Sequence, residues 1–292
     1  MTLEELISSW FTANDSLAGS LAQYAKRPAV FLQSAPADNQ PGWGKGQYPR
    51  IVYSIDMRAD SERKSAGRIV VDLYCDASGV PPEELEPKIR GCLKDLILEP
   101  DDGSPYCFVW ATTQPFELER NGSNDKRVIG SEVVFDVLEY PEQITTDPDP
   151  VTAINRFLKS AFPEILVLGL DELKDHYAVA TEQHPIAYVR VVNHELDHCS
   201  FALSWLNCRM AIHVIAPSAR ARNKWVRCVN NLLVTEQECL MDDGSPIRIT
   251  SSAANSAFDY LISGQISLNT QYTMIRLKTA KAAPVENIKV RR

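Results

Sequence analysis

One motif in the sequence has residue types and spacing that are typical of metal chemistry. Residues 194–198 read HELDH, which matches the HExxH pattern of zinc hydrolases. In those enzymes the motif lies on a helix, so that both histidines bind zinc while the glutamate polarises a metal-bound water. A zinc metallohydrolase using His194, Glu195 and His198 is therefore one hypothesis. A third ligand would have to come from His213, Glu236 or Glu238.

The sequence around this motif argues against the helix that the chemistry requires. The motif follows residues 188–192, a strand-like run, and Asp197 adds a charge where such helices are usually uncharged. A structural metal site is a second reading of the same region. Its ligands would be His194, His198, Cys199 and Cys208. Neither reading is favoured, and we expect no metal and no cofactor.

Other catalytic signatures are missing from the sequence. There is no GxSxG motif, no Walker loop and no dinucleotide-binding glycine pattern. Asp101 and Asp102 are adjacent carboxylates, but neighbouring residues of an Asp-Gly turn point apart, and turn chemistry explains them without acid–base catalysis. We therefore predict no catalytic residues and a protein that is not an enzyme.

A repeat organises the chain. The letters DDGSP occur at residues 101–105 and again at residues 242–246. Each copy follows a helical apolar pattern with a cysteine at the same place, Cys92 in the first and Cys228 in the second. Strand-like runs at residues 68–74 and 209–215 precede those helices in the same order. Because the period is about the size of a domain, the sequence predicts a tandem domain duplication.

The predicted fold class is α+β, with two copies of a small domain. Each copy is expected to hold an antiparallel or mixed β-sheet, a long β-hairpin and helices packed on one face. The predicted boundaries are residues 1–144 for the first domain, 145–150 for a linker, 151–277 for the second domain and 278–292 for a basic tail.

Turn and capping signals place the elements of each copy. Thr2 and Glu5 form a capping box that starts the first helix, and Asp149 with Pro150 starts the first helix of the second copy. The first copy is expected to hold a hairpin at residues 51–57 and 69–75, a helix from about 87 to 98, strands at 106–111 and 129–140, and a loop at 114–126. The second copy is expected to hold a hairpin at residues 186–192 and 210–215, a helix at 223–234 and a strand at 266–277.

Charge and cysteine content restrict the kind of protein. The 292 residues carry a net charge of −8, which divides into −11 for residues 1–150 and +3 for residues 151–292. Opposite signs on related domains would suit different partners or a head-to-tail contact between neighbouring chains.

Seven cysteines without a CxxC pair indicate reduced thiols in a cytosolic protein. No targeting signal is recognised, and no apolar run approaches the ~18 residues that span a bilayer.

Two charged segments are the candidate interface residues. The tip of the first hairpin mixes both signs and could lie against a neighbouring subunit. It contains Arg58, Asp60, Glu62, Arg63 and Lys64. A basic run in the second copy enters a helix and could meet an acidic patch on a partner. It contains Arg220, Arg222, Lys224 and Arg227.

The order of these elements resembles a family of bacteriophage proteins. An N-terminal amphipathic helix, a Pro-Gly loop, YPRIVYSI, AGRIVVDLYCDA and a helix with IRGCLKDLI are similar to the tail terminator or tail completion proteins of long-tailed phages. The resemblance covers most of residues 1–142 and, more loosely, residues 150–277. The usual member of the family is a single domain, so the duplication departs from it.

This resemblance implies a structural protein of the virion, made in the host cytoplasm and located in the tail or neck. Such proteins form a ring that caps the tail tube and joins it to the head connector. The implied partners are other copies of the chain, the tail tube protein and a connector or neck protein, with DNA only as cargo passing through the lumen and no membrane. Six chains would bring twelve domains, and three would give a pseudo-sixfold ring. Another neck or baseplate component of a phage or phage-like particle is the alternative.

Overall fold

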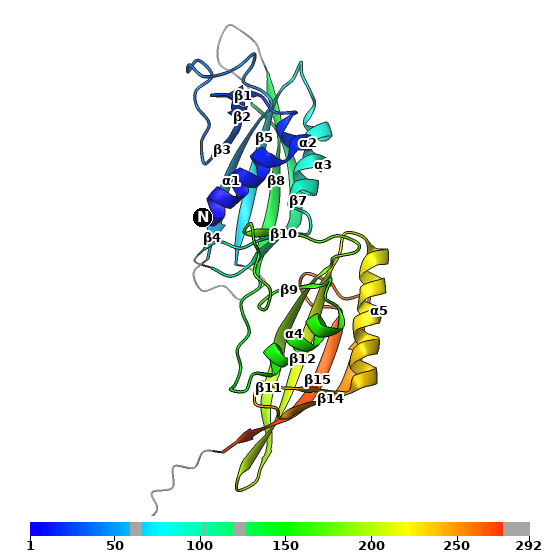
Figure 1. The fold of residues 1–292 in the computed structure, drawn as a ribbon. Coiled ribbons are helices and arrows are strands. Elements are labelled where there is room, and N and C mark those ends of the chain that lie inside the picture. Colours follow the sequence, from blue (N-terminus) through cyan, green and yellow to red (C-terminus); the bar gives the residue numbers. More distant parts are fainter. Residues whose placement is uncertain (59–65, 102, 119–126, 277–292) are drawn as a thin grey trace, which may run out of the picture.

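The computed structural model describes residues 1–58, 66–101, 103–118 and 127–276 (Figure 1). The chain is a mixed α+β protein in which strands outnumber helices, and the strands form two curled sheets. The helices are α1 (Leu3–Ala13), α2 (Asp15–Ala18), α3 (Pro82–Leu93), α4 (Pro150–Ala161) and α5 (Ala219–Glu236). Of the described helices, none is both long and apolar enough to cross a membrane.

The first sheet has the strand order β10-β6-β7-β8-β5-β4-β3. All its pairings are antiparallel except that of β3 with β4, which is parallel. Its strands are β3 (Val30–Leu32), β4 (Arg50–Met57), β5 (Gly67–Asp76), β6 (Leu96–Leu98), β7 (Tyr106–Leu118), β8 (Val128–Glu139) and β10 (Tyr177–Val179). A separate short ribbon pairs β1 (Gln23–Tyr24) with β2 (Arg27–Pro28).

The second sheet has the order β13-β14-β15-β12-β11-β9. Again only the pairing of the outermost strand, β9 with β11, is parallel. Its strands are β9 (Leu166–Val167), β11 (Ile186–Cys199), β12 (Leu203–Ile215), β13 (Glu238–Leu240), β14 (Pro246–Ala254) and β15 (Ile266–Ile275). Apart from β10, the two sheets therefore have the same strand order and the same strand directions when strands are matched by their order in each half.

Each sheet is covered on one face by helices, which is the expected way to bury an amphipathic helix. In the first half, Ile7 and Phe11 of α1 and Ile89 of α3 are fully buried against strand residues such as Val71 and Val133. In the second half, α4 and α5 pack on the second sheet in the same way, with Ile154 and Val229 at the centre of the core. On the opposite face of each sheet, the residues nearest the junction of the two halves are apolar and buried, among them Leu138 in the first sheet and Tyr188 in the second.

The two halves are joined by a third core and by a shared strand. After α4 the chain returns to the first sheet, where β10 pairs antiparallel with β6. Residues from both halves meet in one buried cluster, which includes Tyr140 from the first half and Tyr188 from the second, with ring centroids 4.7 Å apart. The Tyr140 hydroxyl also donates a hydrogen bond of 3.1 Å to the Leu261 carbonyl. The halves therefore share a buried core and are not two separate globular units.

Several predicted elements are confirmed. Thr2 and Glu5 form the capping box of α1, and the Asp149 side chain accepts from the Thr152 amide at the start of α4. Both predicted hairpins are present as β4–β5 and β11–β12. The two DDGSP segments occupy equivalent places, between β6 and β7 and between β13 and β14.

The helix predicted from about residue 87 to 98 is wrong at both ends. The helix α3 begins at Pro82, and Pro87 lies in its interior instead of its first turn. The helix ends at Leu93 because Lys94 is extended and Asp95 has a positive φ of 56°. The chain thereby turns into β6, whose three residues are all buried between β7 and β10.

Three predicted strands are too short. β7 extends to Leu118, whereas residues 114–126 were expected to form a loop. In the second half, β11 continues to Cys199 and β12 begins at Leu203, so this hairpin is longer than predicted. Pro115 fits within β7 because, beyond Cys107, the described residues pair this strand only with β8, and an edge strand tolerates a missing amide donor. Residues 119–126 lie outside the described ranges.

Candidate assembly surfaces

The HExxH segment lies on a strand and not on a helix. His194 pairs across the ladder with buried Cys208, and His198 pairs with Trp205, after a register shift between Leu196 and His198. Because Cys208 and Trp205 are three residues apart on β12, their side chains point to opposite faces of the sheet. The two histidines are therefore directed to opposite faces, and the helical zinc site that the hydrolase hypothesis requires is not formed.

Both histidines have other contacts. His194 Nε2 lies 2.7 Å from the Tyr272 hydroxyl, with the two rings stacked, and His198 Nδ1 lies 2.8 Å from Asp197. Burial raises the pKa of Cys208 to about 12, so that thiol is protonated at neutral pH when no metal is bound. Within the described ranges, no group of three or more His, Cys, Asp or Glu side chains is arranged to hold a metal ion. The ligand set His194, His198, Cys199 and Cys208 is therefore not brought together.

The candidate residues at the first hairpin tip lie mostly outside the described residues. Of these, only Arg58 is described. It is exposed, directly after β4, and its amide donates to the Ala66 carbonyl. Asp60, Glu62, Arg63 and Lys64 fall in residues 59–65, which the structure does not describe.

The predicted basic run divides into two groups on α5. Arg220, Lys224 and Arg227 are exposed and spaced four and three residues apart, so they share one helix face. No described carboxylate forms an ion pair with these three side chains. We call this set the basic face. The prediction of one continuous basic run is wrong for Arg222, which does not belong to this face.

Arg222 points to the junction of the two halves instead. Its guanidinium lies over the Tyr260 ring, 4.0 Å from the centroid, and donates a 2.8 Å hydrogen bond to the Ala216 carbonyl. The sequence could not separate Arg222 from its neighbours, because the loop that carries Tyr260 is about forty residues away in the chain. The only available signal was that Arg222 is two residues from both Arg220 and Lys224, and helix residues two apart do not share a face.

Neighbouring carboxylates lie on the face of the first sheet that is turned away from α1 and α3. Asp72 on β5 lies directly opposite Glu132 on β8, and Asp136 pairs with Arg68 at 3.3 Å. Burial raises the pKa of Asp72 above its usual value, and the nearby Glu132 carboxylate raises it further.

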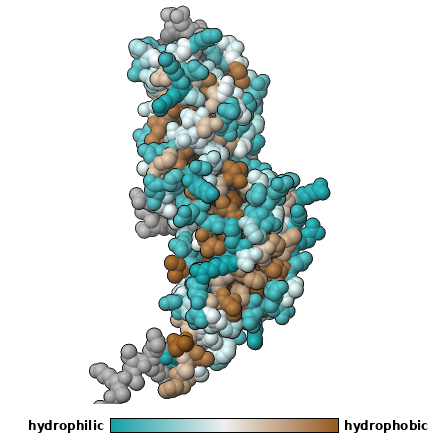
Figure 2. Space-filling model, viewed as in Figure 1, coloured by the Kyte–Doolittle hydropathy of each residue, from teal (hydrophilic) through white to brown (hydrophobic). Residues whose placement is uncertain are grey.

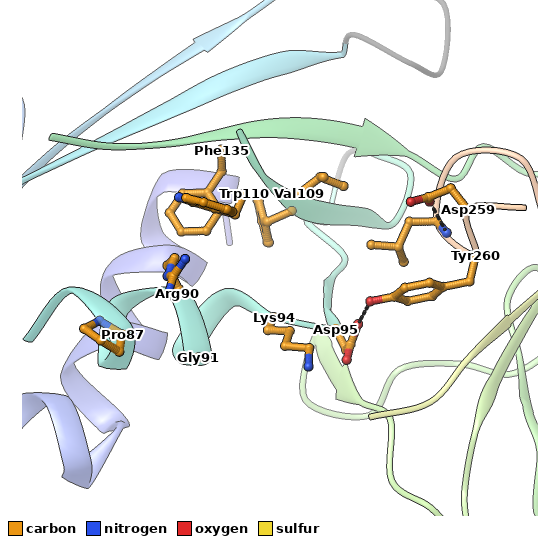
Figure 3. A pocket seen from close by; sticks show the side chains of 12 residues that line it. Pro87, Arg90, Gly91, Lys94, Asp95, Val109, Trp110, Phe135, Asp259 and Tyr260 are labelled. Carbon is orange, nitrogen blue, oxygen red and sulfur yellow. Dashed lines mark hydrogen bonds between the residues drawn. The ribbon is translucent and has the colours of Figure 1, made fainter. Parts of the chain in front are cut away.

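Sequence reasoning did not identify the pocket at the waist of the molecule. It lies between α3, β7 and the loop that joins β14 to β15, and its volume is about 420 Å³ (Figure 3). Its walls are largely apolar, with Phe108, Val109, Trp110, Phe135 and Leu261 among them. We call this cavity the waist pocket.

A hydrogen bond between the two walls of the waist pocket joins the halves, and other polar groups line each wall. Tyr260 donates a 2.6 Å hydrogen bond to Asp95 Oδ1, and Asp259 Oδ1 accepts from the Leu261 amide at 2.8 Å (Figure 3). On the α3 side, Arg90 lies 4.5 Å from the centroid of the Trp110 ring. Burial raises the pKa of Asp95, although the hydrogen bond from Tyr260 and the charges of Lys94 and Arg222 oppose it.

A second exposed apolar group lies at the far end of the β11–β12 hairpin. Phe201 is 82% exposed, Ile275 is 70% exposed and Leu196 is 57% exposed. Leu203 pairs with Ile275, which places the end of β15 beside the hairpin turn. Hydrophobic side chains are visible at this lower end of the molecule (Figure 2). We call Leu196, Phe201 and Ile275 the hairpin tip.

No protein-family model matches the chain, and no curated protein sequence matches it either.

Proposed function

We propose that this chain is a structural protein that assembles into a ring at the end of a bacteriophage tail or a phage-like tail, and that it acts by assembly and not by catalysis. The observation that carries the proposal is the strand order shared by the two sheets. A chain with two similar halves offers the same type of surface twice. In a ring of such chains each chain contributes two similar domains, so the apparent rotational symmetry is twice the number of chains.

The shared topology also supports an origin of the two halves by duplication of one domain. Both halves follow the order helix, parallel edge strand, hairpin, helix and three antiparallel strands. The DDGSP turn precedes β7 in one half and β14 in the other, at equivalent positions. Equal topology with an equal turn sequence at an equal position is simplest to explain by duplication.

The distribution of charge supports a ring around DNA. An acidic surface repels the phosphate backbone, whereas each Lys or Arg contact would add affinity by releasing counterions. Asp72 and Glu132 are partly exposed on the face of the first sheet that is turned away from α1 and α3, and they would suit the lumen. The basic face of α5, with Arg220, Lys224 and Arg227, is then available for a tail tube or connector protein.

Native mass spectrometry over a range of protein concentrations, with and without a chelator, tests this function. We expect discrete trimers or hexamers whose mass contains no metal and which the chelator does not change. A chain that stays monomeric at every concentration, or that loses a bound zinc and an activity on chelation, would contradict the proposal.

A further inference from the structure

The hairpin tip and the waist pocket are complementary in character. Phe201 at the tip is the most exposed large apolar side chain among the described residues, and exposed apolar groups are common at protein contacts. The waist pocket is an open apolar recess in the same chain, formed by α3, β7 and the β14–β15 loop, whereas Phe201 lies in the β11–β12 turn. One surface is a projection and the other a recess of a size that holds aromatic groups.

Gly91 borders open space at the waist pocket. It lies on α3 and lines the pocket, and a Cβ atom at this position would meet no atom within 4 Å. A glycine near the end of a helix costs up to about 1 kcal/mol relative to alanine. Neither a positive φ nor a close neighbour requires glycine here. The space above Gly91 is therefore available to an incoming side chain.

The charges around the two surfaces also match. The α3 wall of the pocket carries Arg90 and Lys94, and the opposite wall carries Asp259. Near the tip, β11 carries Glu195 and Asp197, and Arg276 follows β15. If the β11 side faces α3, Asp197 meets Lys94 and Arg276 meets Asp259, so the charge pattern favours one orientation. Arg90 is already paired with Glu86, and Asp197 with His198.

We propose that the hairpin tip of one copy of this chain inserts Phe201 into the waist pocket of the next copy, over Gly91. This inference rests on the proposed ring and names the contact that builds it. The surfaces that meet are different, so the contact is head to tail and repeats from chain to chain. A repeated contact of this type closes into a ring when a full turn is a whole-number multiple of the rotation that relates one chain to the next.

Two substitutions test the contact by mass photometry. Phe201→Ser removes the projection, and Gly91→Leu fills the recess while improving helix propensity. Each should raise the concentration needed for half-assembly about tenfold or more, as expected for a buried aromatic anchor. Gly91→Leu should not lower the midpoint of thermal unfolding, which separates a filled pocket from a damaged fold. The double variant should be little worse than either single variant, because both remove the same contact.

Matched controls use similar changes away from these surfaces. Ile144→Ser removes an apolar side chain that is 73% exposed in the segment between the halves, and Glu84→Leu adds a leucine elsewhere on α3. Neither should change assembly. A control that weakens assembly as much as its partner variant would mean that general surface hydrophobicity, and not this contact, drives association.

Cross-linking between different chains tests the geometry directly. Cys199 is exposed near the tip, so all chains carry Cys199→Ser. A Gly91→Cys chain is mixed with a Phe201→Cys chain and treated with a short bismaleimide. We expect a cross-linked pair containing one chain of each type and little product from either chain alone.

The outcomes separate this contact from the ring itself. If the unaltered chain forms rings but Phe201→Ser assembles normally and no mixed pair forms, the proposed contact is wrong and the ring stands. If Gly91→Leu alone weakens assembly, another group occupies the pocket and the contact is also wrong. If the unaltered chain never assembles, both proposals fail.

Discussion

The hydroxyl of Tyr260 donates a 2.6 Å hydrogen bond to Asp95, and this bond joins the two halves of the chain. Tyr260 comes from the loop between β14 and β15, and Asp95 from the turn between α3 and β6. Asp95 is only 4% exposed, so its carboxylate depends on the few groups around it. The junction between the halves therefore includes a specific polar contact within an apolar interface.

Replacing Tyr260 should destabilise the protein. Tyr260→Phe leaves the buried Asp95 carboxylate without its hydroxyl donor, which should cost about 1–3 kcal/mol of unfolding free energy. Urea denaturation measures the change. Tyr177→Phe is the matched control, because its ring packs on Trp10 while no described residue accepts a hydrogen bond from its hydroxyl. Equal losses in the two variants would contradict the role given to Tyr260.

The raised pKa of Asp95 predicts a pH dependence of stability. Because burial raises this pKa in the folded state above its unfolded value, the folded state binds the proton more tightly. Lowering the pH from neutral through the raised pKa should therefore stabilise the unaltered chain relative to Asp95→Asn. Urea titrations of both chains across this range measure the difference. A difference that is flat or of opposite sign would show that Asp95 is not the group responsible.

Arg222 and Arg220 should differ sharply although both belong to the predicted basic run. Arg222→Ala loses the contact over Tyr260 and the hydrogen bond to the Ala216 carbonyl, and should cost about 2 kcal/mol. Arg220→Ala, on the exposed basic face, should change stability by less than about 0.5 kcal/mol. Thermal unfolding of the two variants side by side checks the contrast, which would disappear if Arg222 were an ordinary surface residue.

The pair of like charges on the first sheet should be destabilising. Asp72 and Glu132 lie directly opposite each other, so Glu132→Gln should stabilise the fold by about 0.2–1 kcal/mol. Asp136→Asn on the same strand is the control, because it removes the ion pair with Arg68 and should give no gain. Urea denaturation distinguishes them. No gain from Glu132→Gln would mean that the two carboxyl groups do not repel each other.

Zinc should not stabilise the protein. The two histidines of the HExxH segment point to opposite faces of the second sheet, so the described ligands do not converge on one ion. The midpoint of thermal unfolding should be the same with added zinc and with a chelator. A rise with zinc that disappears in His194→Ala would restore the metal hypothesis.

The sequence predicted those elements whose signals are local. The capping box at Thr2, the cap at Asp149 and the hairpin alternation each depend on a few adjacent residues, and all are present. The end of α3 was missed because Leu96 and Ile97 continue the helical spacing, whereas the positive φ at Asp95 redirects the chain. A buried short strand and a buried helix turn have the same apolar letters.

The candidate surfaces were harder to predict because they depend on contacts between distant segments. The waist pocket combines α3, β7 and a loop from the second half, and no local pattern signals that meeting. Arg222 was grouped with its neighbours for the same reason. The exposed Phe201 was not singled out, since an apolar residue in a turn gives no sign of its exposure.

Electron microscopy of the purified chain tests the central claim most directly. Class averages should show closed rings with threefold or sixfold symmetry and a central channel wide enough for duplex DNA. Isolated elongated particles with the outline of the single chain at all concentrations, or open filaments without rings, would contradict it.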